Sequence, residues 1–218
     1  MAQEPGTVQT LNKKDRKQKS AKRERLTQKA IVTAAAELFA RNGFGATSLD
    51  DIAAVLSATK GALYYHIKNK EEILRLIFLT VLTVSEEPLS RLVEADLPPT
   101  EKLRRAIEHQ VSTAADRSPA MTVFFREQAH LTGPFAKEIL LRKKAYERYF
   151  EHIIMEGQAV GAFQPDIDPR LATFGLLGMC NSLSQWYRSE GPFSPPQIAT
   201  TFANMIEHGL TLSPAPIV

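Results

Sequence analysis

Residues 47–70 read TSLDDIAAVLSATKGALYYHIKNK, and this stretch decides the fold. Its first half carries four apolar residues that share one face of a short helix of about two turns: Leu49, Ile52, Ala53 and Leu56. A brief turn at residues 57–58 follows, and the pattern then predicts a second short helix over residues 59–67. In such a pair the first helix braces the second, which can present its N-terminal side chains to the major groove of DNA. Many small helical hairpins share this spacing, so the spacing alone does not show that this pair of helices binds DNA.

The net charge of +3 is distributed unevenly along the 218 residues. Between residues 13 and 25, eight basic side chains stand against two acidic ones, so this segment carries +6 and the remainder sums to −3. Residues 1–24 also lack apolar periodicity, which predicts a basic arm that is disordered without a partner. A solubilising tail would have the same composition, but the position beside the two short helices favours binding of a polyanion.

The residues around this stretch resemble the signature of the TetR family of transcriptional regulators. The resemblance is carried by AAAELF at 34–39, NGF at 42–44, ATSLDDIA at 46–53, TKGALYYHI at 59–67 and KEE at 70–72. Three residues depart from the family pattern. Ser57 stands where the turn often has glycine, Ala62 where threonine or serine is common, and Ile67 where phenylalanine is usual. Because only glycine enters left-handed backbone conformations without cost, the serine bears on the geometry of the turn.

The resemblance implies a three-helix DNA-binding domain over residues 25–70, whose first helix runs from about residue 25 to 42. Ten residues are expected to face DNA, through base edges or phosphates: Thr47, Ser48, Thr59, Lys60, Gly61, Ala62, Tyr64, Tyr65, His66 and Lys70. Residues matching Thr47, Tyr64 and Lys70 are backbone contacts in the family. Lys60 is expected at a guanine edge or a phosphate. Two alternatives stay open: Tyr64 packs between helices, and His66 packs in the core or caps a helix.

The rest of the chain has the pattern of helix after helix, which predicts an all-α fold of about nine helices. Candidate N-caps recur at Thr100, Ser118 and Asp168, and the last two precede prolines, which suit the first position of a helix. Ser194 and Gln197 have capping-box spacing and mark the start of the final helix. The main interruptions are expected at Pro88, Pro98–Pro99, Gly133–Pro134 and residues 161–165.

A ligand-binding and dimerisation domain is expected over residues 71–212, followed by a tail of residues 213–218. Its helix pattern resembles TetR-type ligand domains. GAFQPDID at 161–168 and WYRSEGPFS at 186–194 are similar to the branch that contains regulators of steroid and fatty-acid catabolism, which respond to acyl-coenzyme A thioesters. The resemblance therefore implies a small effector that is hydrophobic or acyl-CoA-like.

The effector pocket is expected among the middle helices, where bulky and polar side chains combine. The candidate lining residues are Phe124, Phe125, Gln128, Tyr146, Tyr149, Phe150, Phe174, Asn181 and Trp186. An ordinary core has the same aromatic spacing, so the alternative for each residue is simple packing. A coenzyme A ester also needs basic partners for its phosphates, and the helix carrying Trp186 has none between Arg170 and Arg188.

Two helices, at about 169–188 and 195–209, are candidates for a dimer interface. Gly175 and Gly178 permit close approach of another helix. The resemblance implies that both helices join those of a second subunit in a four-helix bundle. A homodimer is also what two half-sites of a palindromic operator require. The alternative is that both helices complete the core of the monomer.

Enzyme chemistry is not evident in the sequence, and neither a cofactor nor a metal is expected. The five histidines show no metal-ligand spacing with each other or with Cys180, and a nucleophile elbow, a glycine-rich phosphate loop and a coenzyme-binding βαβ unit are missing. Cys180 lies in an apolar helix, which favours a small buried hydrophobe over a redox sensor. One cysteine excludes an internal disulfide and fits the cytoplasm. No apolar run approaches the roughly 20 residues that span a bilayer, so no membrane partner is expected.

The sequence therefore predicts a ligand-responsive transcriptional repressor. Two alternatives remain: a DNA-binding regulator or architectural protein without a small effector, and an activator, because the sequence does not encode the sign of regulation.

Overall fold

The computed structural model describes residues 26–211, so the arm predicted over residues 1–24 and the tail predicted over 213–218 lie outside the described residues. The described chain forms ten α-helical segments and one 3-10 helix, without a strand, and the all-α prediction is confirmed. Only Ser182 separates α9 (Pro169–Asn181) from α10 (Leu183–Trp186), and counting these two as one gives the expected nine. No helix among residues 26–211 has the length and apolar character needed to cross a membrane.

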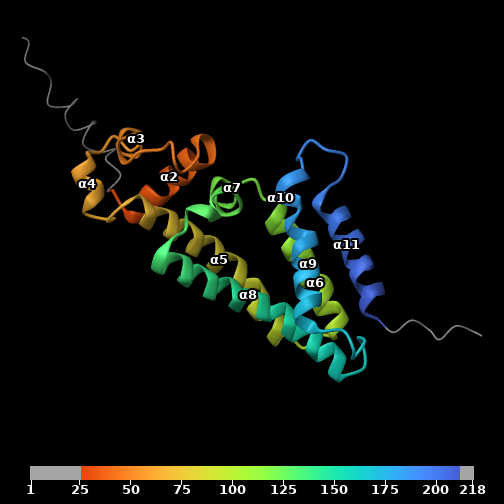
Figure 1. Cartoon of the computed structure of the whole chain (residues 1–218). Helices are drawn as coiled ribbons and strands as arrows, with labels where there is room; N and C mark the ends of the chain where they lie inside the picture. The colour runs from red at the N-terminus through yellow and green to blue at the C-terminus, as the bar shows by residue number, and fades with distance from the viewer. Residues whose placement is uncertain (1–25, 212–218) are drawn as a thin grey trace, which may run out of the picture.

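Three helices form a head at one end of the molecule: α2 (Gln28–Asn42), α3 (Leu49–Val55) and α4 (Lys60–Tyr64) (Figure 1). Each begins at a side chain that accepts a backbone N–H. Thr27 accepts from Ala30, so α2 begins three residues later than predicted. The predicted capping box of Ser48 and Asp51 is confirmed at the start of α3.

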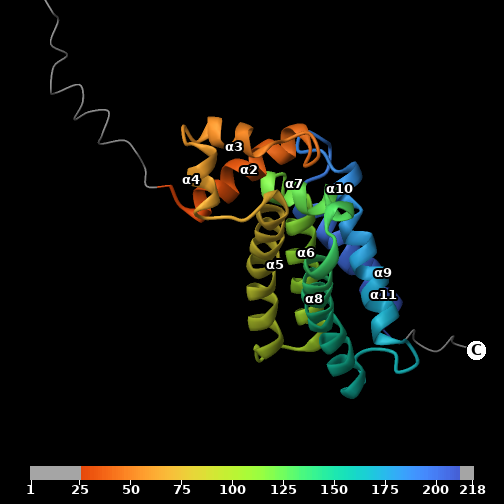
Figure 2. The ribbon, with the colours of Figure 1, turned by 60° about the vertical axis from the view of Figure 1, so that its left-hand side comes forward.

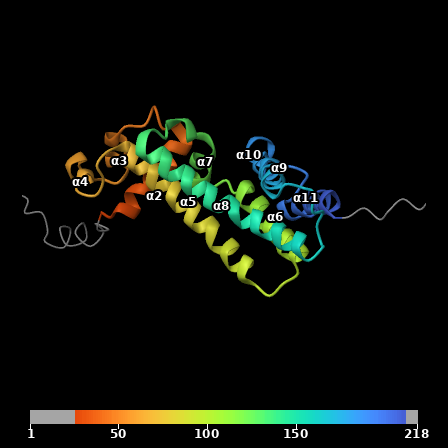
Figure 3. The same cartoon turned by 60° about the horizontal axis from the view of Figure 1, so that its bottom comes forward.

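The remaining helices form the body: α5 (Lys70–Glu94), α6 (Pro99–Ala115), α7 (Pro119–Arg126), the 3-10 helix η1 (Gln128–His130), α8 (Gly133–Ala159), α9, α10 and α11 (Pro195–Leu210). The long helices α5 and α8 lie side by side and lead away from the head (Figures 1 and 3). Seen from the side, α5, α6, α8, α9 and α11 hang below the head, and α7 lies directly beneath α2 (Figure 2).

Two clusters of buried side chains hold these parts together. One lies in the head and includes Phe39, Ile52 and Leu63, but it also takes in Val123 of α7 and Ile139 of α8. The other lies in the body between α6, α8, α9 and α11. Because the first cluster includes side chains of both the head and the body, a shift of α7 or α8 would change the packing of the head.

Besides the later start of α2, the helix boundaries differ from prediction at four places. Pro88 lies inside α5 rather than interrupting it, and α6 begins at Pro99 without a side-chain cap, so the proposed cap at Thr100 is wrong. The helix predicted over 59–67 ends at Tyr64. The helix predicted over 169–188 is divided at Ser182. The predicted helix starts at Ser118, Asp168 and Ser194 are confirmed.

Candidate DNA-binding face and effector pocket

Helix α4 and its two flanking residues present five of the ten predicted DNA-facing residues to solvent: Thr59, Lys60, Gly61, Tyr64 and Tyr65. Leu63 anchors the helix in the core of the head, while Tyr64 and Tyr65 are 52% and 87% exposed. Tyr64 is therefore not packed between helices. His66 is partly buried, its ring stands edge-on to that of Tyr65, and its carbonyl accepts a hydrogen bond from Gln28. The two tyrosines are free to offer hydroxyls and ring faces to a partner.

Lys60, at the first position of α4, is held by an acidic neighbour that the sequence did not single out. Its Nζ lies 2.9 Å from Oδ2 of Asp50 on α3, and both side chains are exposed. The hydrogen bond to Asp50 raises the pKa of Lys60. The ammonium group therefore reaches a base or a phosphate only by sharing or leaving Asp50.

Ser48 and Thr59 stand at the N-termini of α3 and α4, and each hydroxyl accepts a backbone N–H of its own helix, from Asp51 and Ala62. Hydrogen bonds from Ser48, the backbone one foremost, lower the pKa of Asp51. A Cβ added to Gly61 would meet only the Thr59 hydroxyl, at 4.0 Å. Nothing within the described chain therefore requires glycine at 61, and such a requirement would come from a partner.

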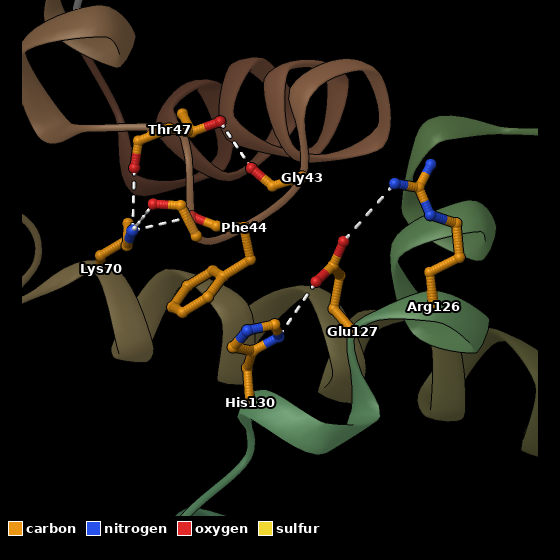
Figure 4. A network of polar contacts seen from close by, with 8 residues as sticks. Gly43, Phe44, Thr47, Lys70, Arg126, Glu127 and His130 are labelled. Carbon is orange, nitrogen blue, oxygen red and sulfur yellow. Dashed lines mark hydrogen bonds and ion pairs between the residues drawn. The ribbon is translucent and has the colours of Figure 1, made fainter.

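Thr47 and Lys70 point into the protein (Figure 4). Thr47 is 1% exposed, and its Oγ1 donates to the carbonyl of Gly43 at 2.9 Å. Nζ of Lys70 donates to the carbonyls of Phe44 and Thr47, at 2.7 and 2.9 Å, and lies 4.4 Å from the Phe44 ring centroid. Carbonyl groups at and after the C-terminus of a helix need such donors, because no following helical turn provides backbone N–H groups for them. Both side chains thus hold the loop between α2 and α3, which differs from the expectation that they hold phosphates.

Replacing Lys70 by methionine is expected to lower the free energy of unfolding by about 2 kcal/mol, because carbonyls of this loop lose a charged donor. Chemical denaturation measures this loss. Lys68→Met is the matched control, since Lys68 is exposed and should change stability by less than about 0.5 kcal/mol. Unchanged stability of the Lys70 variant, with a weaker salt dependence of DNA binding, would instead assign Lys70 to a phosphate.

Ser57, in the turn between α3 and α4, has a φ of +50° and is the one non-glycine residue with positive φ among those described. The turn closes by two backbone hydrogen bonds, from Ser57 to Ala54 and from Ala58 to Ala53. The chain therefore adopts at a serine a left-handed conformation that only glycine enters without cost.

Ser57→Gly is expected to stabilise the head by about 1 kcal/mol, because a side chain in the left-handed region costs about that much. Thermal and urea denaturation report the change. The control Ala54→Gly places a glycine at an exposed position inside α3, where it should destabilise by about 1 kcal/mol. Equal destabilisation by both substitutions would rule out strain at Ser57.

A cavity of about 70 Å³ opens in the body among α5, α6, α7, α8 and α9. Its walls combine aliphatic, aromatic and polar side chains, as small-molecule sites do. They are Val81, Leu82, Ser85, Gln110, Thr113, Phe124, Phe125, Lys143, Tyr146, Glu147, Leu177 and Asn181. Four of the nine predicted residues line it: Phe124, Phe125, Tyr146 and Asn181.

The structure places the other five predicted residues elsewhere. Phe150 is fully buried in the body core, and Tyr149 packs at the edge of that core. Gln128 is one contact removed from the cavity, since its side-chain oxygen accepts from Nζ of Lys143 at 3.0 Å. Phe174 lies on the outer face of α9, and Trp186 lines a separate surface hollow with α11. Residue type indicated which side chains are bulky, but helical spacing did not decide which face of each helix lines the cavity and which packs in the core.

A chain of hydrogen bonds crosses the cavity wall from α8 through α6 to α9. The hydroxyl of Tyr146 donates to Oε1 of Gln110 at 2.5 Å, and Nε2 of Gln110 donates to Oδ1 of Asn181 at 2.7 Å. Burial raises the pKa of Tyr146, so the phenol keeps its proton. Gln110 was missed in the sequence, although it follows Leu103, Ala106 and Ile107 on the buried face of α6.

Cys180 follows the prediction of a buried hydrophobe. It lies on the inner face of α9 with no exposed surface, and burial raises the pKa of its thiol to about 12. It is therefore not a thiolate at neutral pH. Within residues 26–211 no group of His, Cys, Asp and Glu is arranged to hold a metal ion.

Helix α7 connects the cavity to the head. Phe124 and Phe125 line the cavity, while Val123 is buried in the head cluster. Nη1 of Arg126 donates to the carbonyl of Ala40 near the end of α2, at 2.9 Å.

A second contact runs through the residues after α7. The buried carboxylate of Glu127 contacts His130 at 3.1 Å, and the His130 ring lies 5.1 Å from that of Phe44 (Figure 4). Phe44 belongs to the loop that Lys70 holds before α3. One short segment thus touches both the cavity and the base of the two short helices.

Comparison with known proteins relates both halves of the chain to one family. Residues 31–77 match the family model of bacterial regulatory proteins, tetR family, and residues 96–210 match the tetracyclin repressor-like C-terminal domain. The HTH-type transcriptional repressor KstR2 of Mycolicibacterium smegmatis is 26% identical, over 84% of this chain and 90% of that protein. AibR, solved in complex with isovaleryl coenzyme A and operator DNA, is 31% identical, with a TM-score of 0.74 over 82% of this chain and 96% of that one. The regulator PfmR from Thermus thermophilus is 28% identical, with a TM-score of 0.75 over 84% and 99%.

Proposed function

The chain belongs to the TetR family of bacterial regulatory proteins, and on this basis we propose that it is a transcriptional repressor released from DNA by a small effector. It binds a palindromic operator as a homodimer, with α4 of each subunit in the major groove. The effector is hydrophobic or of the acyl-CoA type and occupies the cavity between α5 and α9.

The observation that carries this proposal is the double contact of α7. An effector in the cavity touches Phe124 and Phe125, and the same helix packs Val123 into the head and holds the end of α2 through Arg126. A ligand that binds more tightly when α7 is displaced therefore also favours a shift of the head that α7 contacts. Because α4 is part of the head, its position changes as well. The difference between its affinities for the two arrangements sets how far DNA binding can fall.

The outer face of α9 supports the dimer. Leu171 and Phe174 are 68% and 42% exposed, and they share this face with Gly175 and Gly178 at helical spacing. A Cβ at either glycine would meet nothing within 4 Å, so the monomer gives no reason for small residues there. An exposed apolar face with space for close backbone approach is what a helix of a second subunit requires.

The nature of the effector is supported by the cavity and by one relative. Most of the wall area comes from apolar groups, including Val81, Leu82 and Leu177. AibR, which was solved with isovaleryl coenzyme A, is 31% identical and is matched over 82% of this chain. An open cavity of this kind argues against the alternative of a regulator without a small effector.

Thermal-shift screening tests the proposal, with acyl-coenzyme A thioesters, free fatty acids, steroid-derived thioesters and aromatic acids as ligands. Each ligand that raises the melting temperature is then added to a gel shift with DNA from upstream of the protein's own gene. A ligand that stabilises the protein and releases the DNA supports the proposal. If DNA binds but no ligand changes either signal, the effector half is wrong. If a ligand strengthens DNA binding, the protein is not a repressor released by its effector.

A further inference from the structure

The hydrogen-bonded chain of Tyr146, Gln110 and Asn181 runs in one direction in the structure, from the phenol to the amide of Asn181. A phenol hydroxyl at Tyr146 donates to the amide oxygen of Gln110, which turns the amide nitrogen of Gln110 toward Asn181. The oxygen of Asn181 accepts that bond, so its own NH2 group remains as the end of the chain. Among residues 26–211 this NH2 group has no hydrogen-bond acceptor.

This end of the chain lies at the cavity. Asn181 lines the wall and is partly exposed, whereas Gln110 and Tyr146 behind it are buried. A buried polar network is costly unless its members are satisfied, and the buried amide of Gln110 uses both its oxygen and its nitrogen within the chain. The NH2 group of Asn181 makes no such bond, and it belongs to a partly exposed residue that lines the cavity. The wall therefore offers a hydrogen-bond donor of set orientation to whatever occupies the cavity.

The charges at the cavity balance each other. Lys143 and Glu147 both line it from α8, and both are partly exposed. The ammonium of Lys143 already donates to Gln128. A ligand carboxylate beside Asn181 would be attracted by Lys143 but repelled by Glu147, so the two charges together do not offset the cost of desolvating it. A ligand ammonium group would face the donor end of the chain. An uncharged acceptor avoids both penalties.

We infer that the effector carries an uncharged carbonyl group, such as that of a thioester, ester or amide, whose oxygen accepts a hydrogen bond from Nδ2 of Asn181. The apolar acyl part of the effector lies against Val81, Leu82 and Phe124. The rest of the effector extends out of the cavity between Lys143 and Glu147. This inference rests on the proposed function and makes Asn181 the residue that distinguishes acyl compounds from alkyl compounds of equal size.

Matched ligands that differ only at the carbonyl test the inference. The probes are acetyl-, isovaleryl- and octanoyl-coenzyme A, each paired with the S-alkyl-coenzyme A thioether that has CH2 in place of the carbonyl, and with the free acid. Isothermal titration of the full chain gives the ratio of thioether to thioester dissociation constants. For the wild type we expect at least one pair to show a ratio of roughly ten, the value of one hydrogen bond to a neutral group, and the free acid to bind more weakly.

Asn181→Asp keeps an acceptor for Gln110 but removes the NH2 donor, so it should lower this ratio to one or below. The added charge acts on the coenzyme A part of both members equally, and it also repels the carbonyl oxygen of the thioester, which moves the ratio in the same direction. Tyr146→Phe frees the amide of Gln110 to turn and should lower the ratio in part. Asn204→Asp, an exposed substitution on α11, should leave the ratio unchanged.

Each result decides something different. A wild-type ratio of one, or a ratio that persists in Asn181→Asp, overturns the inference but leaves the proposed function intact. A free acid that binds more tightly than its thioester overturns the uncharged character of the acceptor. If none of the probes binds the wild type, both the acyl-type effector of the proposed function and the inference drawn from it are wrong.

Discussion

The double substitution Leu171→Glu, Phe174→Glu is expected to make the protein monomeric and to lower its affinity for a two-half-site operator at least a hundredfold. Both side chains project from the outer face of α9, next to the positions where glycine leaves open space. Two glutamates per subunit would place four like charges in a desolvated interface, at a cost of several kcal/mol. A monomer then binds each half-site separately. It loses the increase in affinity that comes from binding both half-sites at once, which is about 10²-fold to 10⁴-fold for linked sites.

Sedimentation velocity and fluorescence anisotropy with full and half operators measure the two effects. Leu141→Glu is a matched control, because Leu141 is 67% exposed on α8, outside this face. It should leave both the mass and the affinity unchanged. Circular dichroism of the double variant should match the wild type, since neither residue is buried. A dimer that survives the double substitution would place the interface elsewhere and leave α9 as part of the monomer.

Removing residues 1–24 is expected to weaken operator binding about a hundredfold near 0.1 M salt and to flatten its salt dependence. The described head has few uncommitted cations, because Lys60 is paired with Asp50 and Lys70 holds the loop carbonyls. Residues 13–24 hold seven basic side chains. Each one that neutralises a phosphate contributes about 0.9 to the slope of log K against log salt, so the slope should fall by at most about 6 per subunit.

A titration of anisotropy against salt measures this slope for the wild type and the shortened chain. A full-length variant with Lys13, Lys14, Lys17 and Lys19 changed to glutamine separates charge from length, and its slope should lie between the other two. If the shortened chain keeps both the affinity and the slope, the segment is a solubilising tail and the head binds phosphates by itself.

The sequence by itself determined the class of fold and the position of the two short helices. Helical spacing, N-caps such as Ser48 and Asp168, and the uninterrupted motif around residues 47–70 all act within a few residues of each other. Their outcome in the structure is therefore close to the prediction. Such signals are local, because a cap or an apolar face is set by residues one turn apart. Even the departure at Ser57 was visible, as a serine where a left-handed turn favours glycine.

Only the tertiary structure decided what the individual polar side chains do. Lys70 lies next to Phe44 although 26 residues separate them, and its ammonium group donates to carbonyls of the loop before α3. Lys60 likewise takes its partner from the preceding helix. Helical periodicity assigns a residue to a face, but it contains no information about which distant carbonyl or carboxylate will be packed against that face.

The cavity shows the same division. The sequence supplied the aromatic residues of α7 and α8 but could not separate Phe124, at the cavity, from Phe150, in the core. It passed over Gln110, whose partners Tyr146 and Asn181 come from two other helices. The helix-turn-helix is thus determined by neighbours along the chain. The effector site exists only where five helices meet, and its chemistry is fixed by contacts that no local pattern encodes.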